Sequence, residues 1–264
     1  MSNETHTGGT FSLARRLRAG ESVYSGWCGM AAPHIAETLA REGFDAVTFD
    51  QQHGLYDMAA TATGIAAVHH AGSAPIVRIP LGDIAVASRA LDFGAEGIIA
   101  PMINTVADAH ALVSATKYPP LGERSWGPHR ATTLGRMPDQ KVYLREANSL
   151  TLTFAMIETR TALDNLDAIA ATPGIDALFL GPSDLSIALS NGSTLDPVSV
   201  EVERELDRIV AAAQKHGKIA GAYCHNAARA KAVEKRGMRF MAIGSDLNFL
   251  RAGAAAEMKV LKGT

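Results

Sequence analysis

The chain has 264 residues, of which 47% are hydrophobic and 20% are charged, and its formal net charge is −2. This balance is ordinary for a folded soluble enzyme and gives no reason to expect nucleic acid or an anionic membrane as a partner. The two cysteines, Cys28 and Cys224, are too few for a disulfide framework, and we find neither an apolar signal core nor a membrane-spanning stretch. We therefore expect a cytoplasmic protein with reduced thiols.

Short apolar runs alternate with helical patterns along the chain. The predicted strands are Ser22–Cys28, Asp45–Phe49, Pro75–Ile79, Gly97–Pro101, Leu152–Ile157, Ala177–Leu180, Lys218–Tyr223 and Phe240–Ile243. The predicted helices are Pro33–Glu42, Met58–Ala71, Asp83–Phe93, Val106–Ala115, Thr161–Thr172, Pro197–His216, Ala227–Arg236 and Asn248–Val260. Such strand–helix repeats without a break in composition predict an α/β fold, a single (β/α)8 TIM barrel, which commonly needs about 250 residues. We expect a flexible N-terminal segment at residues 1–13 and one domain at residues 14–264.

One long segment, Lys117–Pro138, has neither a predicted helix nor a predicted strand. A structureless insert of this length is more often functional than accidental. The competing fold is a Rossmann sheet, but no G-x-G-x-x-G sequence follows the first predicted strand, and no Walker-type G-x-x-x-x-G-K occurs. The barrel is therefore the favoured fold.

Two acidic residues, Glu158 and Asp184, follow successive predicted strands. The carboxyl ends of parallel strands meet at one face of a barrel, where function collects, so the two carboxylates can converge there. Hard carboxylate oxygens suit Mg²⁺ or Mn²⁺ whose coordination is completed by water or a chelating substrate. Either acid alone would be interpreted as a helix cap, but the pair in equivalent places favours a metal site.

Other polar residues follow strands at the same face. Arg78 lies at the end of the third strand, where it can hold a carboxylate, neutralise an enolate or simply pair with one of the acids. His53, in the loop after the second strand, can move protons near neutral pH, although a lone histidine is more often structural. The turn Gly181–Asp184 can hold a substrate carboxylate through its backbone N–H groups, or serve only as a helix N-terminus.

The basic residues elsewhere carry less information. No lysine lies at the carboxyl end of a predicted strand, which argues against a Schiff-base aldolase and leaves a metal as the electron sink. His69, His70 and His225 lack the spacing of metal ligands, and we interpret them as structural or surface residues.

Several motifs occur in a characteristic order. They are Asp50–Gly54 (DQQHG), Val77–Pro80 (VRIP), Leu91–Ala95 (LDFGA), Tyr118–Gly122 (YPPLG), Ile157–Arg160 (IETR) and Gly181–Ser186 (GPSDLS). Together they resemble the HpcH/HpaI family of class II pyruvate aldolases, and the resemblance runs from about Leu17 to the C-terminus. It implies metal-dependent, reversible cleavage of 4-hydroxy-2-oxo acids to pyruvate and an aldehyde.

The resemblance also implies roles for single residues. Glu158 and Asp184 would bind the metal, either Mg²⁺ or Mn²⁺, with Co²⁺ or Zn²⁺ as further candidates. Arg78 would stabilise the pyruvate enolate, and His53 would transfer protons. Asp92 resembles an acid that partners this histidine from a neighbouring subunit.

A carboxylate-binding turn and an assembly follow from the same resemblance. The backbone of Gly181, Ser183 and Asp184 resembles the turn that binds the substrate carboxylate. The family is typically a homohexamer, a trimer of dimers that exchange a C-terminal helix. The predicted helix Asn248–Val260 fits this exchange.

The chain departs from the family pattern near the metal. Gln51 and Gln52 stand where many members have Gly and Glu, and Met156 stands where many have Gln. The Gln-His-Gly form, with Glu123–Pro128 (ERSWGP), resembles a macrophomate synthase-like branch that forms the enolate by decarboxylating oxaloacetate. An aldolase is thus the leading function and an oxaloacetate decarboxylase the alternative. A non-catalytic barrel that binds a small oxo acid is the third possibility.

Overall fold

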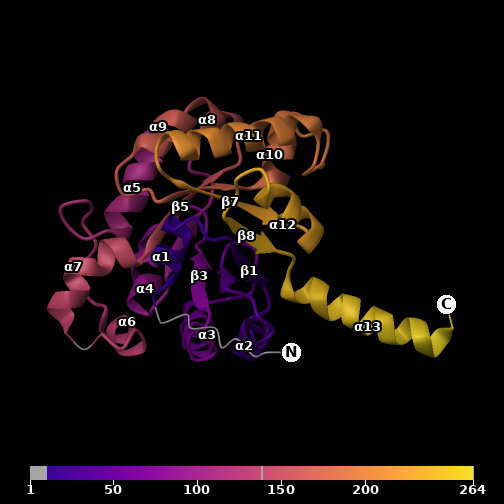
Figure 1. Cartoon of the computed structure of the whole chain (residues 1–264), viewed down its shortest axis with the longest axis horizontal. Coiled ribbons are helices and arrows are strands. Elements are labelled where there is room, and N and C mark those ends of the chain that lie inside the picture. Colours follow the sequence, from indigo (N-terminus) through magenta and orange to yellow (C-terminus); the bar gives the residue numbers. More distant parts are fainter. Residues whose placement is uncertain (1–10, 138, 264) are drawn as a thin grey trace.

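The structure, a computed structural model, describes residues 11–137 and 139–263. Its eight strands are all parallel and form a closed barrel in chain order, with the eighth strand hydrogen-bonded to the first (Figure 1). The strands are β1 (Val23–Cys28), β2 (Ala46–Asp50), β3 (Ala74–Arg78), β4 (Gly97–Ala100), β5 (Leu152–Ile157), β6 (Ala177–Leu180), β7 (Ile219–Cys224) and β8 (Phe240–Ile243). The predicted (β/α)8 TIM barrel is confirmed.

The helices lie outside the barrel and cover the strands. In the described residues they are α1 (Leu13–Arg18), α2 (Pro33–Arg41), α3 (Met58–His70), α4 (Ala85–Asp92), α5 (Val106–Thr116), α6 (His129–Leu134), α7 (Gln140–Leu150), α8 (Arg160–Asp164), α9 (Leu166–Ala171), α10 (Pro182–Leu189), α11 (Val200–Lys215), α12 (Ala227–Glu234) and α13 (Asp246–Lys262). The helix predicted at Thr161–Thr172 is divided into α8 and α9 at Asn165, whose side-chain amide donates to the carbonyls of Asn104 and Thr161.

The inside of the barrel is filled by aromatic side chains and closed at its amino end. Phe154 packs against Phe240 with ring centroids 4.8 Å apart, and against Phe179 edge to face at 6.4 Å. Leu13 and Leu17 of α1 belong to the same buried cluster. Since α1 covers the amino end, the opposite end of the barrel is the one that remains open for chemistry.

The chain is already packed at Phe11. Its backbone N–H and that of Leu13 each donate to a carboxylate oxygen of the buried Glu96 at 3.0 Å. Residues 1–10 of the segment expected to be flexible lie outside the described residues. The last three residues of that segment are held by the barrel.

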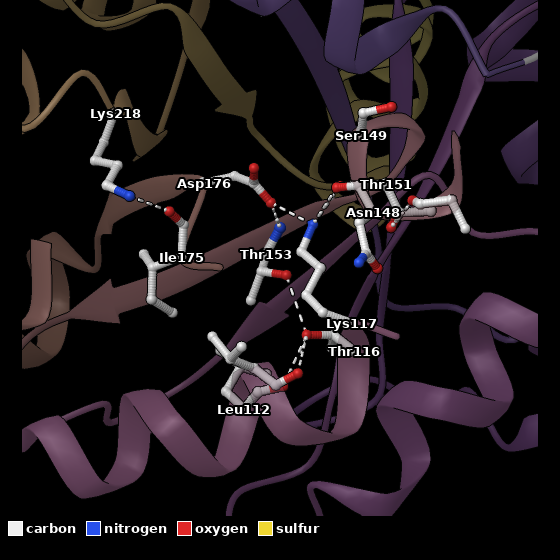
Figure 2. A network of polar contacts seen from close by, with 12 residues as sticks. Leu112, Thr116, Lys117, Asn148, Ser149, Thr151, Thr153, Ile175, Asp176 and Lys218 are labelled. Atoms are coloured by element: carbon white, nitrogen blue, oxygen red, sulfur yellow. Dashed lines mark hydrogen bonds and ion pairs between the residues drawn. The ribbon is translucent and has the colours of Figure 1, made fainter. Parts of the chain in front are cut away.

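The segment Lys117–Pro138 is not the structureless insert that we expected. Lys117 is buried. Figure 2 shows that its Nζ donates to the carbonyls of Asn148 and Thr151 and to Asp176 Oδ2, at 3.0, 2.7 and 2.7 Å. The segment also contains α6, whose six residues are too short to show a helical period in the sequence. The hydrogen bonds of Lys117 lie at the amino ends of β5 and β6, away from the open end of the barrel.

The last helix, α13, projects from the barrel (Figure 1). Only its first residue, Asp246, is buried, and its carboxylate accepts the backbone N–H groups of Gly29 and Met30 at 3.0 and 2.8 Å. Residues 247–263 are exposed along their length, including the apolar Leu250 and Val260. Within the described ranges, no helix has the length and apolar character that crossing a membrane requires.

Candidate active site

A cavity of about 260 Å³ opens at the carboxyl end of the barrel. Its walls come from strand ends and from the loops that follow them: Trp27, His53, Arg78, Met156, Gly181, Pro182, Ser183, Asp184, Tyr223 and His225. The structure therefore brings together five residues that the sequence singled out, namely His53, Arg78, Gly181, Ser183 and Asp184.

Glu158, directly after β5, is not among the described residues that line this cavity; it lies behind Gly181, with 1% of its surface exposed. Its Oε1 accepts the N–H of Met102 at 2.8 Å, and its Oε2 has no hydrogen-bond partner among the described residues. A Cβ added at Gly181 would collide with this Oε2, so only glycine fits beside the carboxylate. Burial, helped by the nearby charge of Asp184, raises the pKa of Glu158 to about 7 despite the Met102 hydrogen bond and the charge of Arg78.

This carboxylate has the properties of a metal ligand. An unpaired, buried carboxylate oxygen is costly unless a cation or proton compensates it. Met102 adopts a left-handed backbone conformation, with φ of 52°, at the point where its N–H meets Glu158. No group of three or more His, Cys, Asp or Glu side chains suited to a metal occurs in the part of the chain that the structure describes. Glu158 and Asp184 would thus leave most coordination positions of a Mg²⁺-like ion to water and substrate oxygens.

Arg78 is held by Asp50, the first residue of the Asp50–Gly54 motif, to which we assigned no role from the sequence. Its Nε and Nη2 donate to the two oxygens of Asp50 at 2.9 and 2.6 Å, and its guanidinium lies 4.8 Å from the ring centre of Trp27. Burial alone would raise the pKa of Asp50, but the hydrogen bonds and charge of Arg78 lower it below its usual value. Arg78 is therefore paired with this aspartate rather than with Glu158 or Asp184, and it presents its remaining edge to the cavity.

The loop after β2 positions His53. Asp50 Oδ1 accepts the backbone N–H groups of Gln52 and His53 at 3.0 and 3.2 Å, which folds the loop back over the strand end. A Cβ at Gly54 would collide with the carbonyl of Asp50. The Asp-x-x-His-Gly spacing thus orients His53, with its exposed side chain at the cavity.

The opposite wall comes from β7. Tyr223 donates its hydroxyl to the carbonyl of Gly244 at 3.1 Å, and its ring meets that of His225 edge to face at 5.3 Å. His225 is exposed, as we expected of a surface residue, and its side chain also lines the cavity, which we did not predict. His69 fits that interpretation, since it is buried and its Nε2 is 2.7 Å from the carbonyl of Gly94.

Asp92 lies elsewhere. It is the last residue of α4, and since the helices run antiparallel to the strands, it lies toward the amino end of the barrel. It accepts a hydrogen bond from Arg124 Nη2 at 2.7 Å, and it is not among the described residues that line the cavity. A carboxylate is unfavourable at the negative, C-terminal end of a helix, so Asp92 does not cap α4. Within one subunit Asp92 does not meet His53, so a joint role requires a neighbouring subunit.

Comparison with known proteins identifies the family. The model of the HpcH/HpaI aldolase/citrate lyase family matches residues 24–252. The chain belongs to this family. A hydroxypyruvate/pyruvate aldolase from Rhizorhabdus wittichii is 37% identical, with 89% of this chain and 92% of the relative covered. A 5-keto-4-deoxy-D-glucarate aldolase from Klebsiella pneumoniae is 36% identical, with 86% and 87% covered.

Solved structures agree with this assignment. A family member from Burkholderia cenocepacia superposes with a TM-score of 0.86 at 31% identity, covering 96% of this chain and 100% of its own. Macrophomate synthase superposes with a TM-score of 0.81 at 25% identity, covering 97% and 92%. Because the family is one of aldolases and lyases and these relatives are named aldolases, the chain is an enzyme of the carbon–carbon lyase class.

Proposed function

We propose that this enzyme is a divalent-metal-dependent class II aldolase that reversibly cleaves 4-hydroxy-2-oxo acids to pyruvate and an aldehyde. The observation that carries the proposal is the unpaired, buried Oε2 of Glu158, which lies against Gly181 and feels the charges of Asp184 and Arg78, three residues that line the cavity. The two relatives named as aldolases support the reaction type.

Different groups of the chain would bind different parts of the pyruvate half of the substrate. Glu158 and Asp184 would hold Mg²⁺ or Mn²⁺. A bound divalent ion supplies a Lewis acid for the 2-oxo group. Arg78 places a fixed positive charge next to the oxygen on which the enolate charge develops. The backbone at Ser183 and Asp184, in the first turn of α10, would bind the substrate carboxylate.

Cleavage requires one proton to leave and another to arrive. The C4 hydroxyl loses its proton, the C3–C4 bond breaks, and its electron pair becomes the enolate of pyruvate while the aldehyde departs. Protonation of C3 then gives pyruvate. His53 would carry the proton between the hydroxyl and the solvent, since its side chain lies at the exposed rim of the cavity.

Proton exchange of pyruvate in D₂O tests the proposal. With Mg²⁺ or Mn²⁺ the enzyme should exchange the methyl protons of pyruvate, and chelation or Glu158→Ala should abolish the exchange. A protein that binds pyruvate without exchanging its protons would be an oxo-acid-binding barrel and no aldolase. Full activity after chelation would exclude the metal.

Oxaloacetate decarboxylation is the second candidate. The likeness to macrophomate synthase favours it. Loss of CO₂ yields the enolate without deprotonation of a hydroxyl, so His53→Ala should impair aldol cleavage more than decarboxylation. An equal fall in the two kcat values would contradict the proposed role of His53.

We also propose that α13 is exchanged between subunits, in a dimer that assembles further into a hexamer. Its exposed apolar residues include Leu250 at 58%, Val260 at 80% and Leu261 at 77% exposure. A helix of this length is marginal in water unless it buries an apolar face. A second copy of the chain would supply the missing surface.

A further inference from the structure

The cavity has two chemically different sides. One side carries Arg78 and the turn Gly181–Asp184, from the ends of β3 and β6, and Glu158, directly after β5, is buried behind Gly181. The proposed function assigns these residues to the pyruvate half of the substrate. The other side carries Tyr223 and His225, from the end of β7. The aldehyde half must lie against this second side, because the first is occupied by pyruvate.

Most polar groups on the aldehyde side are already engaged. The indole N–H of Trp27 donates to Asp50 Oδ2 at 3.3 Å, and the hydroxyl of Tyr223 donates to the carbonyl of Gly244 at 3.1 Å. The ring of His225 has no hydrogen-bond partner among residues 11–137 and 139–263. It is therefore the polar ring on this wall with both nitrogens free for a ligand.

The position of His225 is well defined. Its ring meets Tyr223 edge to face, with an interplanar angle of 85°. The next residue, Asn226, caps α12 by accepting the N–H of Arg229 at 2.9 Å, which fixes the backbone beside the ring. Burial lowers the pKa of His225 and the charge of Arg229 lowers it further, so the imidazole is neutral at pH 7 and offers one donor and one acceptor.

We propose that His225 determines acceptor specificity by hydrogen-bonding a hydroxyl group of the aldehyde, so that the enzyme prefers short, uncharged 2-hydroxyaldehydes. A neutral donor–acceptor ring matches a hydroxyl, which also donates and accepts. An acidic aldehyde would need an unpaired cation on this side. Arg229, whose charge reaches His225, is paired with Glu203 at 2.5 Å, and Arg78, the cation among the described lining residues, is bound to Asp50. This inference rests on the proposed aldolase function.

A matched pair of acceptors tests it. Glycolaldehyde and propanal have the same number of heavy atoms and differ by a hydroxyl in place of a methyl group. We expect the wild-type enzyme to have the higher kcat/KM for addition of pyruvate to glycolaldehyde. His225→Ala should lower the glycolaldehyde-to-propanal ratio about tenfold, mainly through KM for glycolaldehyde, as expected for one lost hydrogen bond. His225→Gln, which keeps a donor and an acceptor, should restore part of the ratio.

Two controls separate this inference from the proposed function. His110→Ala, at an exposed position on α5, should keep the wild-type ratio. If the wild type exchanges the methyl protons of pyruvate but His225→Ala leaves the ratio unchanged, the role of His225 is wrong and the aldolase proposal stands. A wild-type preference for succinic semialdehyde over glycolaldehyde would also overturn the role of His225. Absence of exchange and addition in the wild type would overturn the aldolase proposal and this inference with it.

Discussion

Arg78 is held by three contacts, two to Asp50 and one to Trp27. Lysine would keep the positive charge but has no planar fork to bond both oxygens of Asp50. We therefore expect both Arg78→Ala and Arg78→Lys to lower kcat by about 10²–10³, as loss of an oxyanion donor does. The exposed Arg89→Lys serves as the control. Near wild-type turnover of the Lys variant would show that the fork is dispensable.

Glu158 gives the metal-free protein a pH dependence of known sign. Its pKa of about 7 exceeds the ordinary 4.5, so the folded state binds the proton more tightly than the unfolded chain does. Stability of the metal-free protein therefore falls as pH rises from about 4.5 to 7. This shift corresponds to about 3 kcal/mol, since one pKa unit is about 1.36 kcal/mol.

The neutral variant Glu158→Gln should lack this slope. Relative to the wild type without metal, we expect it to gain stability progressively between pH 5 and pH 8, measured by urea unfolding. Mn²⁺ should stabilise the wild type at pH 8 and leave the variant unchanged. The exposed Glu146→Gln, on α7, is the control. Parallel stability curves of wild type and Glu158→Gln would contradict the raised pKa.

The sequence was sufficient to select most residues of the candidate site but not their pairings. Position after a strand identified Arg78 and Glu158, because parallel strands deliver their ends to one face. The pairing of Asp50 with Arg78 was not predicted, because an acid that ends a strand looks the same in the sequence whether it binds an arginine or faces solvent. His225 was overlooked because it has no ligand spacing, and only the closed barrel brings the end of β7 opposite those of β3 and β5.

Among the elements, the amino ends of β5 and β6 depend on Lys117. Its ammonium is 1% exposed and donates to two carbonyls and to Asp176 (Figure 2). Lys117→Met would leave these acceptors buried without their donor, and we expect it to lower the free energy of unfolding by about 3–5 kcal/mol. The exposed Lys141→Met should cost little. A Lys117→Met protein as stable as that control would show that the hydrogen bonds of Lys117 are not needed for stability.

Strands were predicted more closely than helices. Leu152–Ile157, Ala177–Leu180 and Phe240–Ile243 have the bounds that their apolar runs predicted. Short helices such as α1 and α6 were missed, because six residues contain less than two turns of the helical period. The division between α8 and α9 was missed because it depends on hydrogen bonds of the Asn165 side chain, one of them to the distant Asn104.

At the scale of the whole molecule, Asp92 and His53 lie at different ends of one barrel. If they act together, they must come from two subunits. We expect His53→Ala and Asp92→Asn enzymes each to lose most activity. A hybrid assembled from both should regain up to about half of the wild-type activity in each mixed dimer, because one site then combines an intact His53 with an intact Asp92. Absence of recovery in verified hybrids would place Asp92 outside the reaction.

The exposed face of α13 carries the second prediction at this scale. Val260→Glu puts a charge where the exchanged helix would bury an apolar side chain, so the assembly should dissociate to smaller species in light scattering. Lys259→Glu, one residue away and already polar, should keep the native mass. If both variants keep it, α13 does not form the subunit contact.

The carboxylate at the base of α13 gives that helix a mechanical role as well. Asp246 accepts hydrogen bonds from the backbone N–H groups of Gly29 and Met30, immediately after β1, the strand that carries Trp27. The helix therefore has a long exposed part and one anchored residue, Asp246, which is bonded to the loop that follows β1. A force on the exposed part of α13 must either break the hydrogen bonds from the N–H groups of Gly29 and Met30 to Asp246 or move the loop that follows Trp27.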